Sequence, residues 1–461
     1  MEWLNSIINK IKNLNVEVDQ YQKETVIQSL PAHAHVNRAK KLIEKGKYEE
    51  AKDVLLKALE LPQKEALVYK YLGIVYDRLA DFPAAAEAYQ DAADLNPNDK
   101  TIWQQLGFAL MTICKYNEAQ KAFENANTIL LHNTDTLTGW GMALMKLNRL
   151  PEAAQKFQQA VEANKYNFSA IFLGAMLDLK EGDYNKAESK LAYLVKVCPN
   201  ESNSYEYANL KFIKGDIENA IHYAKKAIEF NPSILPAYIL LGKAYSKRHD
   251  RENSLSYFKA AEERELTTAN LYLEWGIALI KFGDLKSAHE KLSRAALLEP
   301  DNAEINEKLD LANILLGNTE TLKHGGQSGV QGDINRGILN RSPELLKKTL
   351  SDEYDDSISY YYLAKFSTND VKIREYYESA ISKNPCYIQA FIDFAEYLIS
   401  KEDFAEAQRK LRKALKVDEN NLELLNLLLC VLAKDNGSEY NRKEALQITR
   451  KIEEISQRLR T

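Results

Sequence analysis

The 461-residue chain has few of the residues that break helices, bind metals or span membranes. Only 18 residues are Gly and 11 are Pro, which argues against a β-sandwich or barrel, since such folds place a turn about every 8–12 residues. No apolar run approaches the roughly 18 residues of a membrane-spanning helix. The opening residues, MEWLNSIINKIK, do not resemble a secretory signal. The net charge of −5 leaves no basic surplus, so we predict no nucleic-acid binding.

Cysteine is also scarce. The four cysteines (Cys114, Cys198, Cys386 and Cys430) are far apart, and none belongs to a CxxC motif. We therefore predict free, buried thiols, no metal site, no cofactor and a cytoplasmic location, where thiols stay reduced. The sequence contains no catalytic motif, and we predict that the protein is not an enzyme.

A repeat of 34 residues organises most of the chain. Gly73, Gly107 and Gly141 follow this spacing, and units of this kind start at 66, 100, 134, 168, 201, 235 and 269. In each unit, apolar residues at positions 4, 7, 8 and 11 and at positions 20, 24 and 27 predict two facing amphipathic helices. Small residues at positions 8 and 20 should let the helices approach closely. Gly at position 15 suits a positive φ at the end of the first helix.

These residues give the chain a resemblance to tetratricopeptide repeat proteins over about 32–316 and, less regularly, about 357–434. The resemblance implies an all-α fold, a right-handed superhelical solenoid of antiparallel helix pairs. We predict four segments: an N-terminal amphipathic helix with its lead-in (1–30), the repeat array (31–316), a flexible Gly-rich loop (317–334) and a C-terminal repeat-like helical region (335–461). Whether the loop separates two domains stays open.

The predicted binding site is the stripe formed by positions 2, 5, 9 and 12 of each first helix, which the resemblance places on the concave face. The stripe is strongly apolar between residues 108 and 212, and every Met except Met1 lies on it. Met is flexible and suits a surface that adapts to a partner. The predicted groove consists of Ile74, Phe108, Met111, Met142, Met145, Phe172, Met176, Leu179, Tyr205 and Phe212.

The predicted function is a protein–protein interaction scaffold that holds an apolar or amphipathic partner segment in this groove. Two alternatives concern the stripe: its side chains pack against one another as core, or the face serves self-association. Two others concern function. Residues 1–15 form an amphipathic pattern, with Trp3, Ile7 and Ile11 on one side. This segment could cover the first exposed core face of the array, dock into its own or a neighbour's groove, or anchor a membrane-peripheral assembly factor. The chain could also be a non-catalytic regulatory subunit of an enzyme complex.

Overall fold

The computed structural model describes residues 31–61, 64–318, 330–350, 356–434 and 439–458. Within these ranges all regular secondary structure is helical, which confirms the predicted all-α fold. Contacts divide the chain into two compact units, unit 1 (Met1–Leu210) and unit 2 (Lys211–Thr461), each described here by itself. The amphipathic helix predicted within residues 1–30, and the membrane anchor that depends on it, lie outside the described residues.

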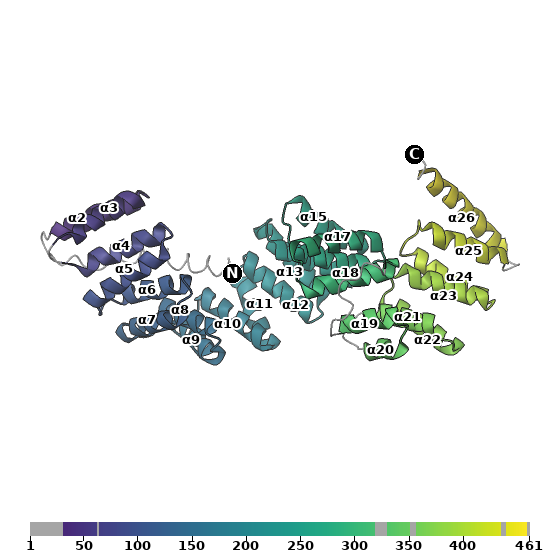
Figure 1. Cartoon of the computed structure of the whole chain (residues 1–461), viewed down its shortest axis with the longest axis horizontal. Coiled ribbons are helices and arrows are strands. Elements are labelled where there is room, and N and C mark those ends of the chain that lie inside the picture. Colours follow the sequence, from purple (N-terminus) through teal and green to yellow (C-terminus); the bar gives the residue numbers. More distant parts are fainter. Residues whose placement is uncertain (1–30, 62–63, 319–329, 351–355, 435–438, 459–461) are drawn as a thin grey trace. The chain divides into compact units, whose positions relative to one another are not determined.

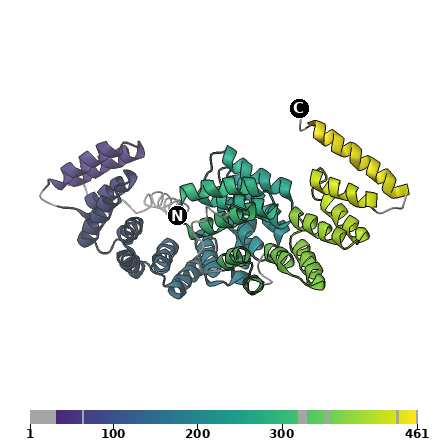
Figure 2. The ribbon, with the colours of Figure 1, turned by 45° about the vertical axis from the view of Figure 1, so that its right-hand side comes forward.

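Unit 1 consists of helix pairs in which each even-numbered helix packs against the odd-numbered helix that follows it (Figure 1). In the view of Figure 2, several of the blue helices of this unit are seen nearly end-on. Its helices are α2 (Pro31–Glu44), α3 (Tyr48–Leu59), α4 (Ala66–Arg78), α5 (Phe82–Leu95), α6 (Lys100–Thr112), α7 (Tyr116–Ile129), α8 (Thr134–Lys146), α9 (Leu150–Ala163), α10 (Phe168–Glu181), α11 (Tyr184–Val197) and the first part of α12 (Glu201–Ile213).

Unit 2 begins inside α12 and repeats the pairing, for example α14 with α15, α16 with α17 and α23 with α24. Its further helices are α13 (Ile217–Phe230), α14 (Leu235–Lys247), α15 (Arg251–Glu263), α16 (Ala269–Lys281), α17 (Leu285–Leu298), α18 (Ala303–Leu316), α19 (Val330–Leu339), α20 (Pro343–Lys348), α21 (Ser357–Phe366), α22 (Asp370–Lys383), α23 (Ile388–Ser400), α24 (Phe404–Leu415), α25 (Leu422–Lys434) and α26 (Glu439–Arg458).

The small residue at position 8 has the packing role that the sequence indicates. A Cβ atom added at Gly73 would lie 2.6 Å from the ring of Tyr89, and one at Gly107 would lie 2.7 Å from the ring of Phe123. Both rings are completely buried. The large residue at position 24 of the second helix therefore packs directly on the backbone of the first helix, at a distance that any side chain would prevent.

The turn at position 15 keeps one backbone conformation whether or not glycine occupies it. Gly182 and Gly283 both have φ of 78°, as predicted. Cys114 and Asn148 stand at the same position of other units and have φ of 63° and 60°. A non-Gly residue with positive φ carries some strain. The left-handed turn is thus a property of the repeat, which the helix pair imposes on residues that disfavour it.

The Gly-rich segment is shorter than predicted. Helix α19 begins at Val330, so the prediction of a loop to residue 334 is wrong for its last five residues. The reason is burial: Ile334 and Ile338, four residues apart, lie on one face of α19 and are both buried. They belong to the same hydrophobic cluster as Ile305 and Leu311 of α18. The helices before and after this segment therefore share one core within unit 2.

A turn in the C-terminal part of unit 2 is also held against its earlier helices. Asn384, which follows α22, donates a hydrogen bond from Nδ2 to the carbonyl oxygen of Lys281 at the end of α16, over 2.8 Å. Its Oδ1 accepts a hydrogen bond from the backbone N–H of Cys386 (3.1 Å), and Asn384 itself is buried. One amide side chain thus satisfies polar groups in two repeats that are about a hundred residues apart in sequence.

The four thiols are unpaired, but they do not share one environment. Cys386 is buried, as predicted for all four. Cys198 is half-buried, and Cys114 and Cys430 are exposed. The prediction of burial is wrong for the two exposed thiols. Cys114 is exposed because it occupies the left-handed turn between α6 and α7, at the edge of the helix pair.

Candidate functional site

The ten residues of the predicted groove separate into two groups by burial. Nine lie in unit 1, on α4, α6, α8, α10 and α12, and Phe212 lies in unit 2. Four are buried: Phe108, Met111, Met142 and Phe172. Six are half-buried: Ile74, Met145, Met176, Leu179, Tyr205 and Phe212. The stripe therefore has a buried floor and a partly accessible margin, so the alternative of mutual packing describes part of it.

Gly139 explains why Phe108 belongs to the floor. A Cβ atom at Gly139 would lie 2.6 Å from the ring of Phe123 and 3.0 Å from the ring of Phe108. The two rings meet edge to face, with centroids 5.0 Å apart. Sequence analysis missed this role because Gly139 stands at position 6 of its unit, whereas the repeat places small residues at positions 8 and 20. A second glycine two residues before Gly141 is the signal that could have revealed it.

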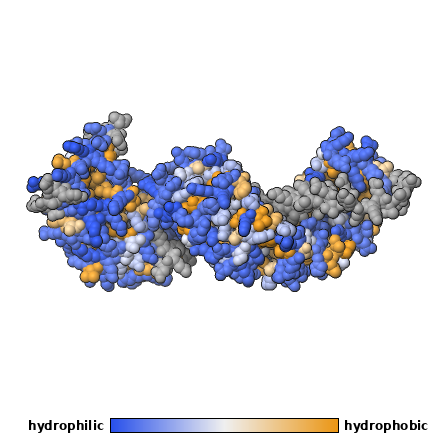
Figure 3. Space-filling view, turned by 180° about the vertical axis from the view of Figure 1, so that it is seen from behind, coloured by the Kyte–Doolittle hydropathy of each residue, from blue (hydrophilic) through white to orange (hydrophobic). Residues whose placement is uncertain are grey.

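Two buried charged groups on the first helices of unit 1 have partners inside the chain. Asp178 on α10 is almost fully buried and accepts a hydrogen bond from Nζ of Lys190 over 2.7 Å. Lys70 on α4 is also buried; it donates to Asp99 (3.1 Å) and to the hydroxyl of Thr101 (2.5 Å). Asp178 and Lys70 therefore add no unpaired charge to the stripe. On the face seen in Figure 3, most residues are hydrophilic and hydrophobic ones form separate patches.

Glu206 on α12 is the polar residue of this region that sequence analysis did not single out. It is half-buried, and no hydrogen bond or ion pair joins it to any residue that the structure describes. Burial raises the pKa of its carboxyl group to about 7. The neighbouring Tyr205 has its pKa raised to about 12, first by burial and then by the negative charge of Glu206. An acid without a partner beside an apolar stripe is an unusual feature for a scaffold.

The raised pKa of Glu206 predicts how stability depends on pH. In the unfolded chain a glutamate titrates near pH 4.3, so between about pH 4.3 and 7 the folded state binds more protons than the unfolded state. Stability from this group is complete below that window and is lost as the pH rises through 7. We expect Glu206→Gln to match the wild type at about pH 4 and below and to be more stable at pH 8, by at most about 4 kcal/mol. Urea unfolding at a series of pH values measures this; a pH-independent difference would contradict it.

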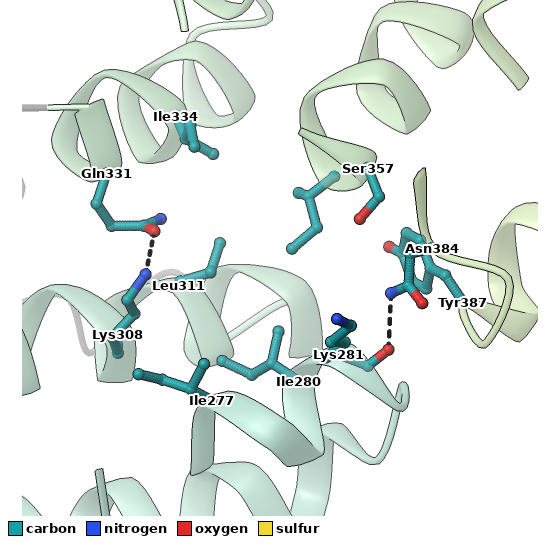
Figure 4. A pocket seen from close by; sticks show the side chains of 11 residues that line it. Ile277, Ile280, Lys281, Lys308, Leu311, Gln331, Ile334, Ser357, Asn384 and Tyr387 are labelled. Atoms are coloured by element: carbon teal, nitrogen blue, oxygen red, sulfur yellow. Dashed lines mark hydrogen bonds between the residues drawn. The ribbon is translucent and has the colours of Figure 1, made fainter. Parts of the chain in front are cut away.

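Unit 2 has an apolar pocket of about 180 Å³ on the corresponding stripe. Ile277 and Ile280 of α16 and Leu311 of α18 form its floor, and Ile334 of α19 lies opposite them (Figure 4). At its edge, Lys308 donates a hydrogen bond to Gln331 Oε1 over 2.7 Å. Ile277 and Ile280 occupy positions 9 and 12 of their unit, so the groove pattern continues beyond Phe212.

Among the described residues, no three His, Cys, Asp or Glu side chains are grouped as a metal site requires. None of the helices described is both long and apolar enough to cross a membrane.

Comparison with known protein families identifies repeats in two segments of the chain. Models of the tetratricopeptide repeat match residues 36–100 and residues 203–234. The chain therefore contains tetratricopeptide repeats in these two segments. No curated protein resembles its sequence closely enough to count as a relative. Tetratricopeptide repeats are helix-pair scaffolds whose extended faces contact other proteins or peptides, and they are typically non-catalytic.

Solved structures similar to this chain differ in how much of it they cover. PilF from Pseudomonas aeruginosa is 20% identical and aligns 45% of this chain with 94% of its own, at a TM-score of 0.40. A chain of the APC/C hetero-tetramer Cut9–Hcn1 is 13% identical. The alignment covers 94% of this chain and 97% of that chain, at a TM-score of 0.45. YrrB, described as having an unusual peptide-binding site, is 26% identical. The alignment covers 40% of this chain and 95% of YrrB, at a TM-score of 0.34.

Proposed function

We propose that the protein is an interaction scaffold whose unit 1 binds an apolar or amphipathic segment of a partner protein. The observation that carries this proposal is the half-buried margin formed by Met145, Met176, Leu179 and Tyr205 on the successive first helices α8, α10 and α12. Half-buried apolar side chains at positions 5, 9 and 12 of successive units offer a surface that a partner can cover.

The buried floor and the flexible margin have different roles in this proposal. Phe108 and Met142 are completely buried, so they hold the first helices at fixed spacing. Met145 and Met176 keep accessible, unbranched side chains that adjust their rotamers to the partner. The scaffold therefore combines a rigid backbone with an adaptable contact surface. Binding buries apolar area and requires no catalytic group.

The thiols support a cytoplasmic location for the scaffold. Cys114 and Cys430 are exposed and unpaired. Exposed free thiols persist in a reducing compartment and oxidise outside it.

A photo-crosslinking amino acid at Leu179 tests the proposed function directly. In cells that express the full chain, we expect crosslinks to a discrete set of proteins through segments rich in apolar residues. The matched control places the same amino acid at Gln158, an exposed residue of the second helix α9. Adding Met176→Glu to the Leu179 probe should remove the crosslinks. The same crosslinks from both positions, or crosslinks that survive Met176→Glu, would argue against a groove in unit 1.

A further inference from the structure

The carboxyl group of Glu206 stands out because its counterpart in another repeat is neutralised within the chain. Glu206 is the sixth residue of α12, and Glu274 is the sixth residue of α16. Glu274 forms an ion pair with Lys243, the ninth residue of α14. Glu206 has no such partner among the residues that the structure describes. The same repeat position thus holds a paired acid in unit 2 and an unpaired acid in unit 1.

The repeat geometry indicates which residue stands where the missing cation would be. The ninth residue of one first helix lies beside the sixth residue of the next first helix. This holds for Lys243 and Glu274, and also for Phe108 of α6 and Gly139 of α8, where a Cβ on the glycine would be 3.0 Å from the ring. The ninth residue of α10 is Met176. A thioether packs well but cannot neutralise a carboxylate.

We propose that the partner segment bound by unit 1 presents a lysine or arginine to Glu206, with the aliphatic part of that side chain against Met176 and Tyr205. This inference rests on the proposed function and specifies the chemistry of the bound segment. A long basic side chain fits because its methylene stem suits the half-buried apolar margin while its charged end reaches the acid.

Other cationic occupants fit less well. A bound metal ion needs several oxygen, nitrogen or sulfur ligands, and the described residues contain no group of three suitable side chains. A small free ammonium ion would leave the apolar margin uncovered. Asp178, the acid two residues from Met176, is already paired with Lys190, so it does not compete for the incoming cation.

The state of the free protein agrees with this assignment. Burial raises the pKa of Glu206 to about 7 without any opposing contribution from a cation. A carboxyl group in this condition gains more from an incoming positive charge than an exposed carboxylate does, since it is partly removed from water. The corresponding pair of Lys243 and Glu274 shows that the fold accommodates such a contact at these two positions.

Phage-displayed random peptides selected on the full chain test the proposal. We expect the peptides whose binding is abolished by Met176→Glu to share one basic residue among apolar ones. In a synthetic peptide, replacing that residue with norleucine should weaken binding to the wild type by about tenfold or more. The same norleucine replacement should change the affinity for the Glu206→Gln variant much less. Glu274→Gln, the matched change at a paired acid, should behave like the wild type.

A second variant tests the same contact from within the chain. Met176→Lys recreates the arrangement of Lys243 and Glu274, so it should raise the melting temperature and remove the preference for a basic residue. Peptides that depend on Met176 but show no basic preference would overturn this inference and leave the proposed function standing. Selection of no peptide that depends on Met176 would overturn both. Glu206→Gln could also weaken binding of the basic peptide and of its norleucine version by the same factor. That result would show that Glu206 has only a structural role.

Discussion

Met142→Glu is expected to unfold much of unit 1, whereas Met176→Glu leaves the unit folded and removes partner binding. Both methionines occupy position 9 of their repeats and look equivalent in sequence. Met142 is completely buried in a cluster with Phe108 and Phe157, while Met176 is half-buried. A carboxylate at residue 142 would lose the apolar packing and also its hydration. We estimate a cost of about 4 kcal/mol or more.

Urea unfolding followed by circular dichroism measures the difference between the two variants. Met142→Leu is the matched control, because a swap of similar volume in a core usually costs less than about 1.5 kcal/mol. Near-equal stability of Met142→Glu and Met176→Glu would mean that the two side chains share one environment. Loss of folding in Met176→Glu alone would identify the margin as core and would remove the basis of the proposed groove.

The same pair of residues illustrates what the sequence can and cannot predict about the site. Periodicity places Met142 and Met176 on one face, because that depends only on the 34-residue spacing. Exposure depends on the neighbouring repeat. Met142 is followed by Leu173 at position 6 of the next unit, and Met176 by Glu206. The residue at position 6 was not used in the prediction, although Lys243 with Glu274 and Phe108 with Gly139 show that it lies beside position 9 of the preceding unit.

The repeat pattern also does not predict how polar residues at core positions are accommodated. Ser254 stands where most repeats have Ala, and Asp178 where most have a large apolar residue, and the repeat pattern alone predicts looser packing at both. Ser254 is completely buried and donates a hydrogen bond to the carbonyl oxygen of Gly242 over 2.8 Å. Asp178 is paired with Lys190. Each substitution is accompanied by a specific partner, which a repeat pattern cannot indicate because the partner differs between units.

The helices themselves were predictable, and the limits of that prediction have a physical cause. Unit boundaries followed from spacing, and the left-handed turn at position 15 from its glycines. The Gly content of residues 317–334 predicts a loop, but α19 begins inside this segment. Burial of Ile334 and Ile338 outweighs the helix-breaking tendency of Gly332 and Gly337. Packing between elements far apart in sequence decided that boundary.

Gly139→Ala is expected to destabilise α8 and its neighbours, although alanine is the better helix former. The new methyl group would lie 2.6 Å from the ring of Phe123 and 3.0 Å from that of Phe108, and both rings are completely buried. Overpacking of this kind costs up to about 3 kcal/mol, against a gain of roughly 1 kcal/mol in helix propensity. Because repeat arrays open locally, hydrogen–deuterium exchange in α6 to α9 should rise even where the global transition changes little.

Gly174→Ala is the matched comparison, since Gly174 is also a buried glycine in a first helix of unit 1. There the tightest contact of the new methyl group would be with Nζ of Lys190, at 3.3 Å, which is the end of a flexible side chain, and Cβ of Phe157 would lie at an ordinary van der Waals distance of 3.9 Å. We therefore expect a gain of about 0.5–1 kcal/mol from helix propensity and slower exchange in α10. If the packing of the floor requires glycine at residue 139, the two substitutions change the free energy of unfolding in opposite directions. If both variants were stabilised, the contact between Phe108 and the backbone of α8 would be looser than its geometry indicates, and Phe108 would belong to the accessible margin.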